Sequence, residues 1–291
     1  MDYGICLPNF PDGASREGME AAAETAERLG WSIAWTTDHL LVPTSAADDY
    51  GRIYEAILSL TWVGARFAKV RLATSVIVVP MRNAVVLAKE LASLDALSGG
   101  RLVVGVGVGW NEEEFRNVGV ADRFHVRGAY LDETIDLWRH LWSGSTKPFH
   151  GRFHQFDDFA FAPLPDQGGS VPIVVGGRAE PALRRAGRKG DWYHSSATSA
   201  KKYSERVPII RAAADAAGRP MPRLTARAWV EFDAPGGRHY SIRGTPEEMA
   251  AEIRAFADLG VDHLAVWFNA TDPDDLAALM GRFDREVAPQ I

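Results

Sequence analysis

The sequence predicts an α/β protein, a (β/α)8 TIM barrel in which residues 1–291 form a single domain with insertions at the carboxyl-terminal face. Three observations lead to this prediction. Short apolar segments of strand type alternate with amphipathic helical patterns along the whole chain, eight of each. Four helix-to-strand junctions place a glycine just before a short apolar strand, in ERLGWSIAW, ALSGGRLVVGV, GRKGDWYH and ADLGVDHLAV. The length of 291 residues suits one such barrel.

A doubly wound parallel sheet is the alternative fold for an alternating chain. That fold requires a glycine-rich phosphate-binding turn, GxGxxG, directly after its first strand. The corresponding region here reads LPNFPDGAS and does not match that turn. The barrel is therefore the favoured prediction.

Each expected strand is a short run of apolar and β-branched residues bounded by glycine, proline or polar residues. In chain order the strands are Tyr3–Leu7, Ile33–Thr36, Val70–Val79, Leu102–Val108, Pro172–Val175, Trp192–Ser195, Leu224–Phe232 and His263–Phe268. The third strand contains the polar pair Thr74–Ser75, which indicates a kink or a hydrogen bond to a ligand. The fourth ends in alternating glycines, Gly105, Gly107 and Gly109, so one of its faces lacks side chains and a flat ring can lie there.

The expected helices carry apolar residues at helical spacing and join consecutive strands. They are Ser15–Leu29, Tyr54–Phe67, Ala84–Leu97, Val126–Trp142, Pro181–Arg188, Ala200–Ala217, Pro246–Leu259 and Pro273–Val287. Two have recognisable starts: Ser15 precedes Gly18, and Thr245 is followed by Pro246 and Glu248 in the pattern of a capping box.

Three connections are longer than the pattern requires. Residues 144–170 are rich in aromatic residues, proline and glycine and are expected to form an insertion with short strands beside the barrel. The loops Asp38–Ile53 and Asp233–Gly244 follow strands and therefore lie at the carboxyl-terminal side, where barrel enzymes build their sites. Such loops commonly form lids or substrate walls, although simple disorder is the alternative for DAPGGRHYS.

The bulk composition excludes several classes of protein. The net charge is −6 with no basic stripe, so we expect no nucleic-acid partner. The N-terminus has no signal-peptide pattern, and no apolar run approaches the ~20 residues of a membrane span, so no membrane contact is expected. The single Cys6 excludes an internal disulfide and is expected to pack in the core. We therefore expect a cytoplasmic protein.

Candidate catalytic residues follow the second strand, in AWTTDHLLVP. Asp38 and His39 fall at the barrel mouth and point in different directions. A histidine there can exchange a proton with a substrate or cofactor near neutral pH. The alternative is a histidine bonded to nearby backbone, but the position at the catalytic face favours the functional interpretation.

An anion site is expected after the fifth strand, in VVGGRAEPALRRAG. The N–H groups of Gly176, Gly177 and the first helical turn suit a phosphate, and Arg178 adds positive charge. Trp110, after the glycine strand, either stacks on a ring or covers the barrel end. No metal site is expected, because the pair of histidines at positions 150 and 154 lies outside any helix.

Four segments together resemble the bacterial luciferase-like monooxygenase superfamily: TTDHLLVP, LATSVIVVP, AKELASLDALSGGRLVVGVGVGWNEEEF and IVVGGRAEPALRRAG. The resemblance extends over residues 1–285 and is strongest to the branch of actinobacterial oxidoreductases that use the deazaflavin coenzyme F420. It implies a barrel with the cofactor ring at the carboxyl-terminal mouth, commonly in a homodimer.

The resemblance also implies roles for individual residues. Asp38 and His39 match the Asp-His pair near the reactive edge of the ring, which makes Asp38 a cofactor-binding residue and His39 the catalytic residue. Ser75 and Val76 match a non-prolyl cis peptide that supports the ring from behind. The remaining cofactor-binding residues implied are Gly107, Val108, Gly109 and Asn111 beside the ring and ribityl chain, and Gly176, Gly177 and Arg178 at the phosphate.

The chain departs from the sugar-phosphate dehydrogenases of the superfamily at two places. Those enzymes have a tryptophan soon after the Asp-His pair and a glutamate after the glycine strand. Here these places hold Pro43 or its neighbours, and Trp110. A sugar-phosphate substrate is therefore not expected.

The leading hypothesis is hydride transfer between coenzyme F420 and a small-molecule substrate, with His39 as proton donor, acceptor or polariser. The alternative is an FMN-dependent two-component monooxygenase that uses molecular oxygen and a separate reductase. A third hypothesis is a cofactor-binding protein without turnover, against which the long loop after the second strand argues. Aromatic residues near strand ends favour an apolar or ring-bearing substrate: Trp35, Trp110, Trp267 and Phe268.

Overall fold

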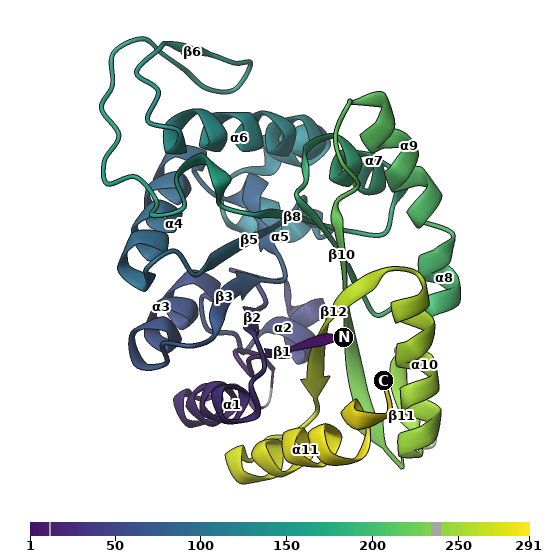
Figure 1. Cartoon of the computed structure of the whole chain (residues 1–291). Coiled ribbons are helices and arrows are strands. Elements are labelled where there is room, and N and C mark those ends of the chain that lie inside the picture. The colour runs from purple at the N-terminus through teal and green to yellow at the C-terminus, as the bar shows by residue number, and fades with distance from the viewer. Residues whose placement is uncertain (12, 234–239) are drawn as a thin grey trace.

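A closed barrel of eight parallel strands forms the centre of the protein, as predicted (Figure 1). The computed structural model describes residues 1–11, 13–233 and 240–291. The barrel strands are β1 (Asp2–Cys6), β2 (Ile33–Thr36), β3 (Arg71–Thr74) continued by β4 (Ile77–Val78), β5 (Leu102–Gly107), β8 (Ile173–Gly176), β9 (Trp192–Ser196), β10 (Arg223–Phe232) and β12 (Val261–Phe268). The barrel closes where β12 pairs with both β10 and β1.

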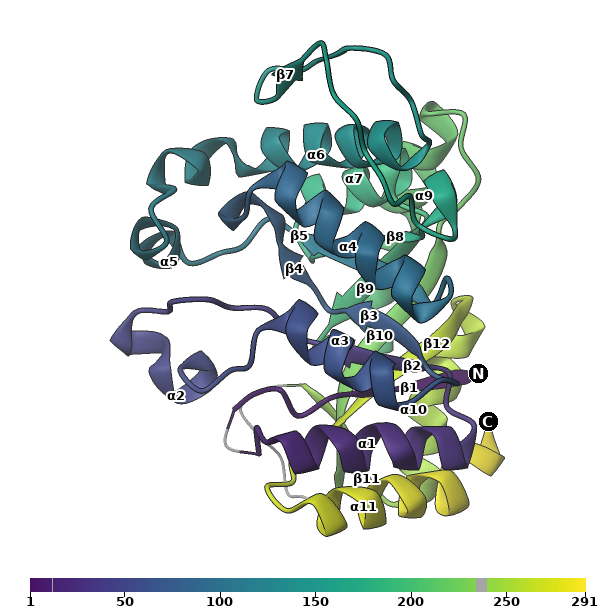
Figure 2. The same ribbon diagram turned by 90° about the vertical axis from the view of Figure 1, so that its left-hand side faces the viewer.

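Helices surround the barrel, so the strands between them are covered on their outer face (Figure 1). The helices are α1 (Arg16–Leu29), α2 (Ala47–Tyr50), α3 (Ala56–Arg66), α4 (Ala84–Ser98), α5 (Glu112–Asn117), α6 (Arg127–Trp142), α7 (Glu180–Lys189), α8 (Ala200–Ser204), α9 (Val207–Ala216), α10 (Pro246–Asp258) and α11 (Pro273–Glu286). The short α2 and α5 project from the end of the barrel opposite to the two chain termini (Figure 2). That end is the carboxyl-terminal mouth, because both follow barrel strands.

The predicted helix starts are confirmed. The Ser15 hydroxyl accepts a hydrogen bond from the Gly18 N–H at 2.9 Å and caps α1. Thr245 and Glu248 form the reciprocal capping box at the start of α10. At the first glycine junction, Gly30 ends α1 in the left-handed conformation with a φ of 73°.

Several predicted elements differ in detail from the structure. The strand expected at Val70–Val79 is interrupted at the Ser75–Val76 peptide, which is cis, as the resemblance implies. The helix expected over 200–217 is divided into α8 and α9. Gly190, at one of the four junctions, has a φ of −79° and is not left-handed. Three elements lie outside the predicted ones, namely α2, α5 and the edge strand β11 (Ser241–Gly244) beside β10.

The insertion at residues 144–170 contains the short strands that the sequence predicts. They form an antiparallel pair, β6 (Phe149–His150) and β7 (Gln155–Phe156). The segment packs on the outside of α6 and α4, through hydrogen bonds to Glu133 and Lys89. Because it connects a helix to a strand, it does not contribute to the mouth. The insertions at the mouth are the loops after β2, β5 and β10, and positions 234–239 of the last lie outside the described residues.

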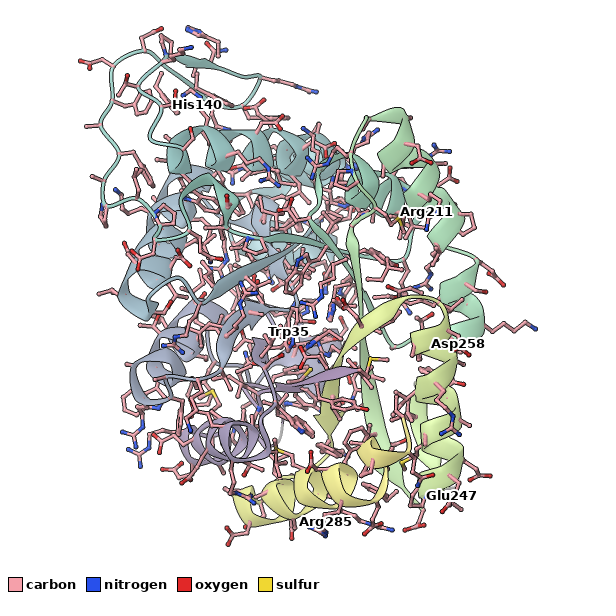
Figure 3. The ribbon with its side chains drawn as sticks, in the orientation of Figure 1. Trp35, His140, Arg211, Glu247, Asp258 and Arg285 are labelled. Carbon is pink, nitrogen blue, oxygen red and sulfur yellow. The ribbon has the colours of Figure 1, made fainter. Side chains whose placement is uncertain are left out.

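The interior of the barrel contains buried polar and aromatic side chains. Trp35 is fully buried near the centre of the barrel (Figure 3) and stacks on His194 with ring centroids 4.7 Å apart. It also donates a hydrogen bond to Nε2 of His263 at 3.1 Å, so it belongs to the core and not to the mouth. Burial raises the pKa of the Cys6 thiol to about 11, which suits the predicted packing role.

No helix in the described ranges is both long and apolar enough to cross a membrane.

Candidate active site

A cavity of about 520 Å³ lies at the carboxyl ends of the barrel strands, a volume in the range of small-molecule and cofactor sites. Residues from seven barrel strands or the loops after them line it, β5 being the strand that contributes none among the described residues. One side is aromatic, with Phe10, Tyr50, Trp229 and Trp267. The aromatic residue predicted near the mouth that does reach the cavity is therefore Trp267.

The structure brings five of the predicted cofactor-binding residues together on the other side of the cavity. They are Ser75, Val76, Gly176, Gly177 and Arg178. The first two come from the junction of β3 and β4, and the others lead from β8 into α7. The Tyr193 hydroxyl fixes this second segment by donating a hydrogen bond to the Gly177 carbonyl at 2.9 Å. This side can therefore present a wall to a ring and free N–H groups to an anion.

Glycines around Val76 make room for its side chain. A Cβ on Gly107 would lie 2.6 Å from one Val76 methyl carbon, and a Cβ on Gly176 would lie 2.7 Å from the other. A Cβ on Gly105 would lie 1.7 Å from the Thr74 carbonyl oxygen. The alternating glycines of β5 therefore accommodate the interrupted strand beside them, and Val76, not the bare face of β5, forms the cavity wall.

The structure does not place Gly107, Val108, Gly109 or Asn111 on the cavity wall. The Asn111 side chain instead caps α5, where its oxygen accepts hydrogen bonds from the N–H groups of Glu113 and Glu114 at 3.1 and 3.3 Å. A contact between these four residues and a cofactor stays a prediction.

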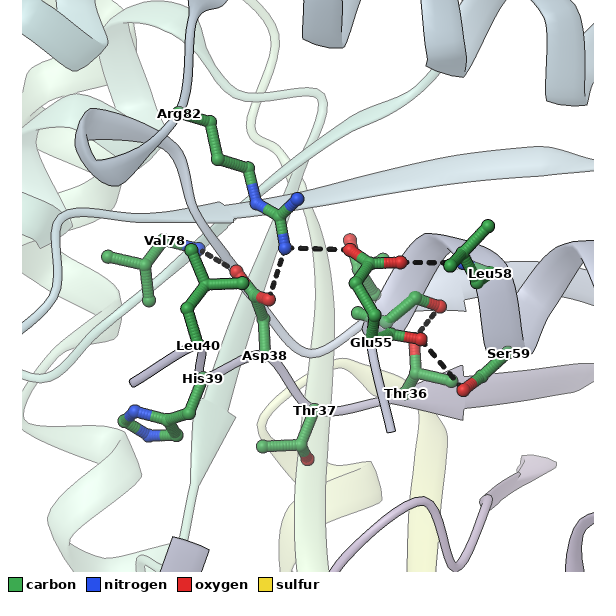
Figure 4. A network of polar contacts seen from close by, with 12 residues as sticks. Thr36, Thr37, Asp38, His39, Leu40, Glu55, Leu58, Ser59, Val78 and Arg82 are labelled. Atoms are coloured by element: carbon green, nitrogen blue, oxygen red, sulfur yellow. Dashed lines mark hydrogen bonds and ion pairs between the residues drawn. The ribbon is translucent and has the colours of Figure 1, made fainter. Parts of the chain in front are cut away.

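Asp38 and His39 point in opposite directions, as predicted (Figure 4). The buried Asp38 carboxylate accepts hydrogen bonds from the Val78 N–H at 2.9 Å and from Nη2 of Arg82 at 2.5 Å. The same nitrogen of Arg82 bonds Glu55 at 2.7 Å. Both oxygens of Asp38 are thus occupied, and its role in this structure is to tie the end of β2 to β4. Its predicted contact with a cofactor is not tested by this geometry.

His39 is buried and hydrogen-bonded to a carboxylate. Its Nδ1 lies 2.8 Å from Oε2 of Glu114, whose other oxygen accepts the Leu40 N–H at 2.7 Å. Because a carboxylate only accepts, Nδ1 carries the hydrogen. Nε2 has no hydrogen-bond partner in the part of the chain that the structure describes. Nε2 is therefore the nitrogen that can exchange a proton with a ligand.

Tyr50 connects His39 to the cavity. Its ring lies 4.1 Å from the His39 ring and 5.6 Å from the Phe10 ring, centroid to centroid. Tyr50 and Phe10 line the cavity, whereas His39 itself is not among the lining residues. Trp110 lies 6.2 Å from His39 in an edge-on arrangement and is 62% exposed. Trp110 thus lies near His39 outside the described cavity lining, and its stacking on a cofactor ring stays a prediction.

Hydrogen bonds fix the orientation of His194, which lines the cavity, and burial keeps its ring neutral. The Thr225 hydroxyl donates to the Tyr193 carbonyl at 2.9 Å, so it accepts from Nδ1 of His194 at 2.8 Å. Nε2 of His194 must then accept from the Ser75 hydroxyl at 3.0 Å. Burial, aided by the charge of Arg227, holds the pKa of His194 well below its ordinary value.

Sequence reasoning missed Tyr50, Glu114, His194 and Arg227. Only one of them had a usable pattern. Along β10, Arg227 alternates with Trp229 and so shares its face, and a charged residue on an inward-facing strand position is unusual enough to indicate a site. The others depend on loops or on partners far apart in the sequence.

The described ranges contain no group of three or more histidine, cysteine or carboxylate side chains able to hold a metal ion. His154 instead bonds Glu133 at 3.0 Å, and His150 pairs with Asp157. The fold and the cavity thus define a (β/α)8 barrel with a small-molecule site at its carboxyl-terminal mouth.

Comparison with known proteins gives the family. The luciferase-like monooxygenase family matches residues 1–261, and the chain belongs to this family. An F420-dependent glucose-6-phosphate dehydrogenase of Kineococcus radiotolerans is 29% identical over 282 residues, covering 88% of this chain and 80% of that protein.

Solved structures of an F420-dependent protein and of an FMN-bound protein both share the fold of this chain. An F420-dependent secondary alcohol dehydrogenase, solved with an F420-acetone adduct, has a TM-score of 0.82 at 21% identity and covers 99% of this chain and 98% of its own. The oxygenating component of 3,6-diketocamphane monooxygenase of Pseudomonas putida, solved with FMN, has a TM-score of 0.81 at 16% identity, with 100% and 99% covered.

Proposed function

We propose that the protein is an oxidoreductase that transfers a hydride between coenzyme F420 and a small organic substrate. The observation that carries the proposal is a cavity of cofactor size walled by Ser75 and Val76, with the His39–Glu114 pair beside it across Tyr50. The relative from Kineococcus radiotolerans, named as F420-dependent, supports this choice of cofactor.

The residues present fit such a group. Ser75 and Val76 would support one face of the ring, and Gly176, Gly177 and Arg178 would hold its phosphate. When bound, a deazaflavin supplies the hydride chemistry, while the protein supplies orientation and exclusion of water.

His39 would move the proton that accompanies the hydride. When an alcohol is oxidised, the hydrogen on its carbinol carbon leaves with the bonding electron pair, and Nε2 of His39 takes the hydroxyl proton. When a carbonyl is reduced, His39 returns that proton. Glu114 holds the ring in the tautomer that this requires and stabilises its positive charge.

The proposed substrate is neutral and apolar or ring-bearing. Phe10, Tyr50 and Trp267 give the cavity an apolar side. Two carboxylates, Asp49 and Glu231, face the cavity against one cation, Arg178, among the described lining residues. Because Arg178 is assigned to the phosphate of the cofactor, no described lining cation remains for a phosphorylated sugar, the substrate in the name of the relative above.

The second candidate is an FMN-dependent two-component monooxygenase, with a separate reductase as partner. The FMN-bound neighbour with a TM-score of 0.81 supports this second candidate, because the same barrel fold can hold either ring. The two candidates differ in one requirement, since only the monooxygenase consumes oxygen.

We also propose that the protein is a homodimer. Exposed apolar side chains lie near the starts of the neighbouring helices α3 and α4, namely Leu58, Val85 and Val86. A second copy of the chain would cover them in a two-fold interface. A cytoplasmic location stays a prediction from the sequence.

The direct test is hydride transfer without oxygen. Purified protein is mixed with oxidised F420 and a panel of linear and cyclic secondary alcohols under nitrogen, and the visible absorbance of the deazaflavin is followed. We expect alcohol-dependent loss of absorbance, reduced on the order of 10²-fold or more in His39→Ala. No reduction by any alcohol and no oxidation of F420H2 by the matching ketones, together with oxygen-dependent product formation from reduced FMN, would establish the second candidate instead.

A further inference from the structure

Arg227 is a buried cation that forms no ion pair with any residue that the structure describes. It is 5% exposed and lies on β10. Its Nη1 donates to the Thr37 hydroxyl at 3.0 Å and to the Ser75 carbonyl at 3.1 Å, and its Nε has no partner. Across the described ranges no carboxylate forms an ion pair with it. Glu231, which also lines the cavity, pairs with Arg243 at 3.6 Å.

Aromatic rings surround this guanidinium. Its central carbon lies 5.7 Å from the ring centroid of Phe10, 5.4 Å from that of Trp229 and 5.3 Å from that of Trp267. All three rings line the cavity. Their π faces attract the cation, but three rings and neutral acceptors replace the hydration of a buried charge only in part. Arg227 thus holds a positive charge beside Ser75 that no ion pair among the described residues balances.

The other ionisable side chain that bonds Ser75 adds no second positive charge beside Arg227. His194 bonds the same Ser75 from another strand, and burial together with the Arg227 charge keeps His194 neutral by lowering its pKa. The arginine stays protonated at any physiological pH. The positive charge is therefore permanent and not a titrating one.

We infer that Arg227 is the counter-charge of the reduced cofactor ring, so that the cavity binds the reduced cofactor more tightly than the oxidised one. This inference rests on the proposed function. A ring that accepts a hydride without a proton gains one negative charge, and Arg227 bonds the carbonyl of Ser75, the residue proposed to support that ring. In a buried site with little water, a fixed positive charge favours the ring in its electron-rich state.

The test compares the dissociation constants of oxidised and reduced F420, measured under nitrogen by quenching of protein fluorescence. The variants are Arg227→Met, Arg227→Gln and Arg227→Lys. The two neutral variants are expected to weaken binding of the reduced form at least about tenfold more than binding of the oxidised form. Arg227→Lys, which keeps the charge, is expected to hold the ratio of the two constants within about threefold of wild type. Arg185→Met is the matched control, because Arg185 is equally buried but paired with Asp132 at 2.7 Å.

Each outcome bears on a different claim. Equal weakening of both redox forms in the neutral variants overturns the inference and leaves the proposed function standing. The inference is also overturned if Arg227→Lys loses the preference for reduced F420 to the same extent as the neutral variants. In that case the geometry of the arginine, and not its charge, would determine the preference. If wild type binds F420 in neither form, the proposed function fails first.

Should Arg227→Met not fold by circular dichroism, Arg227→Gln provides the neutral comparison, since its amide can still donate to the Ser75 carbonyl. Benzoate provides a further outcome. If it competes with F420 for wild type but not for Arg227→Gln, and the ratio of the two dissociation constants is the same in both proteins, the positive charge serves a carboxylate ligand. That result would overturn the assignment of Arg227 to the cofactor ring.

Discussion

Glu114 accepts a hydrogen bond from Nδ1 of His39 at 2.8 Å, although the two residues are 75 positions apart in the chain. Both side chains are buried, and the other Glu114 oxygen is held by the Leu40 N–H. The contact leaves Nε2 of His39 as the nitrogen without a partner among the described residues. Glu114 on α5 thereby determines that Nε2 is the atom of His39 that can take a proton.

Replacing Glu114 by glutamine is expected to lower kcat on the order of 10²-fold, because an amide N–H beside Nδ1 shifts the ring hydrogen to Nε2 and removes the proton acceptor. Steady-state hydride transfer measures kcat, and fluorescence titration measures the dissociation constant of F420, which should stay within about twofold. Glu113→Gln, an exposed position on the same helix, is the control. Wild-type kcat in Glu114→Gln would show that the pair does not act in proton transfer.

Replacing Gly107 by alanine is expected to destabilise the protein by about 1–3 kcal/mol, because the new methyl group overpacks against Val76. The Cβ would lie 2.6 Å from a Val76 methyl carbon. Cofactor binding should weaken as well, since Val76 is displaced from the cavity wall. Urea denaturation gives the free energy of unfolding, and fluorescence titration gives the dissociation constant.

The matched control is Gly169→Ala, whose Cβ would have its nearest neighbour at 3.7 Å. The double variant Val76→Ala/Gly107→Ala should be more stable than the sum of the two single changes predicts, because the smaller side chain relieves the overlap. Additive losses would mean that Gly107 does not accommodate Val76.

Folding stability is expected to fall as the pH drops below about 6.5, the ordinary pKa of histidine. Burial lowers the pKa of His194 and of His263, in the second case against the opposing effect of Asp2. Both rings stay neutral in the folded protein while the unfolded chain takes up protons, so the stability is present at neutral pH and is lost toward acid. The loss should approach about 1 kcal/mol per pH unit for each histidine.

Urea denaturation between pH 5 and 8, a range that brackets the roughly 6.5 expected for free histidine, measures this dependence. His194→Gln should lessen the slope, whereas His125→Gln, at a side chain that is 79% exposed, should leave it unchanged. A stability that is flat across this range would contradict the neutral assignment.

Introducing a charge into the exposed apolar patch is expected to produce a monomer. Leu58 on α3 is 69% exposed, and Leu58→Glu would place a carboxylate in the proposed dimer interface. Light scattering after size-exclusion chromatography gives the mass. Leu164→Glu, on the insertion, is the control and should keep the wild-type mass. A monomeric wild type would refute the dimer.

The barrel was predictable because each of its units has a local pattern, a strand run followed by a helix with recognisable ends. The same holds for the part of the site carried by short motifs. Ser75–Val76, Gly176, Gly177 and Arg178 line one cavity, and His39 lies beside it.

The remainder depends on contacts between distant segments. Nothing near His39 in the sequence indicates Glu114, and the stack of Tyr50 on His39 depends on how the loop after β2 folds back. The glycines of β5 were interpreted as space for a ring, but a neighbouring strand interrupted at Ser75 fills that space with Val76. A local pattern shows that a side chain is missing without showing what occupies its place.

The central claim is that the cavity is a deazaflavin site. Competitive fluorescence titration under nitrogen tests it most directly, with F420 and FMN each offered in the oxidised and reduced form to the wild-type protein. We predict saturable binding of F420, with at least about tenfold weaker binding of FMN in either redox state, a difference of about 1.4 kcal/mol. Tight binding of FMN with no response to F420 in either form would contradict the account.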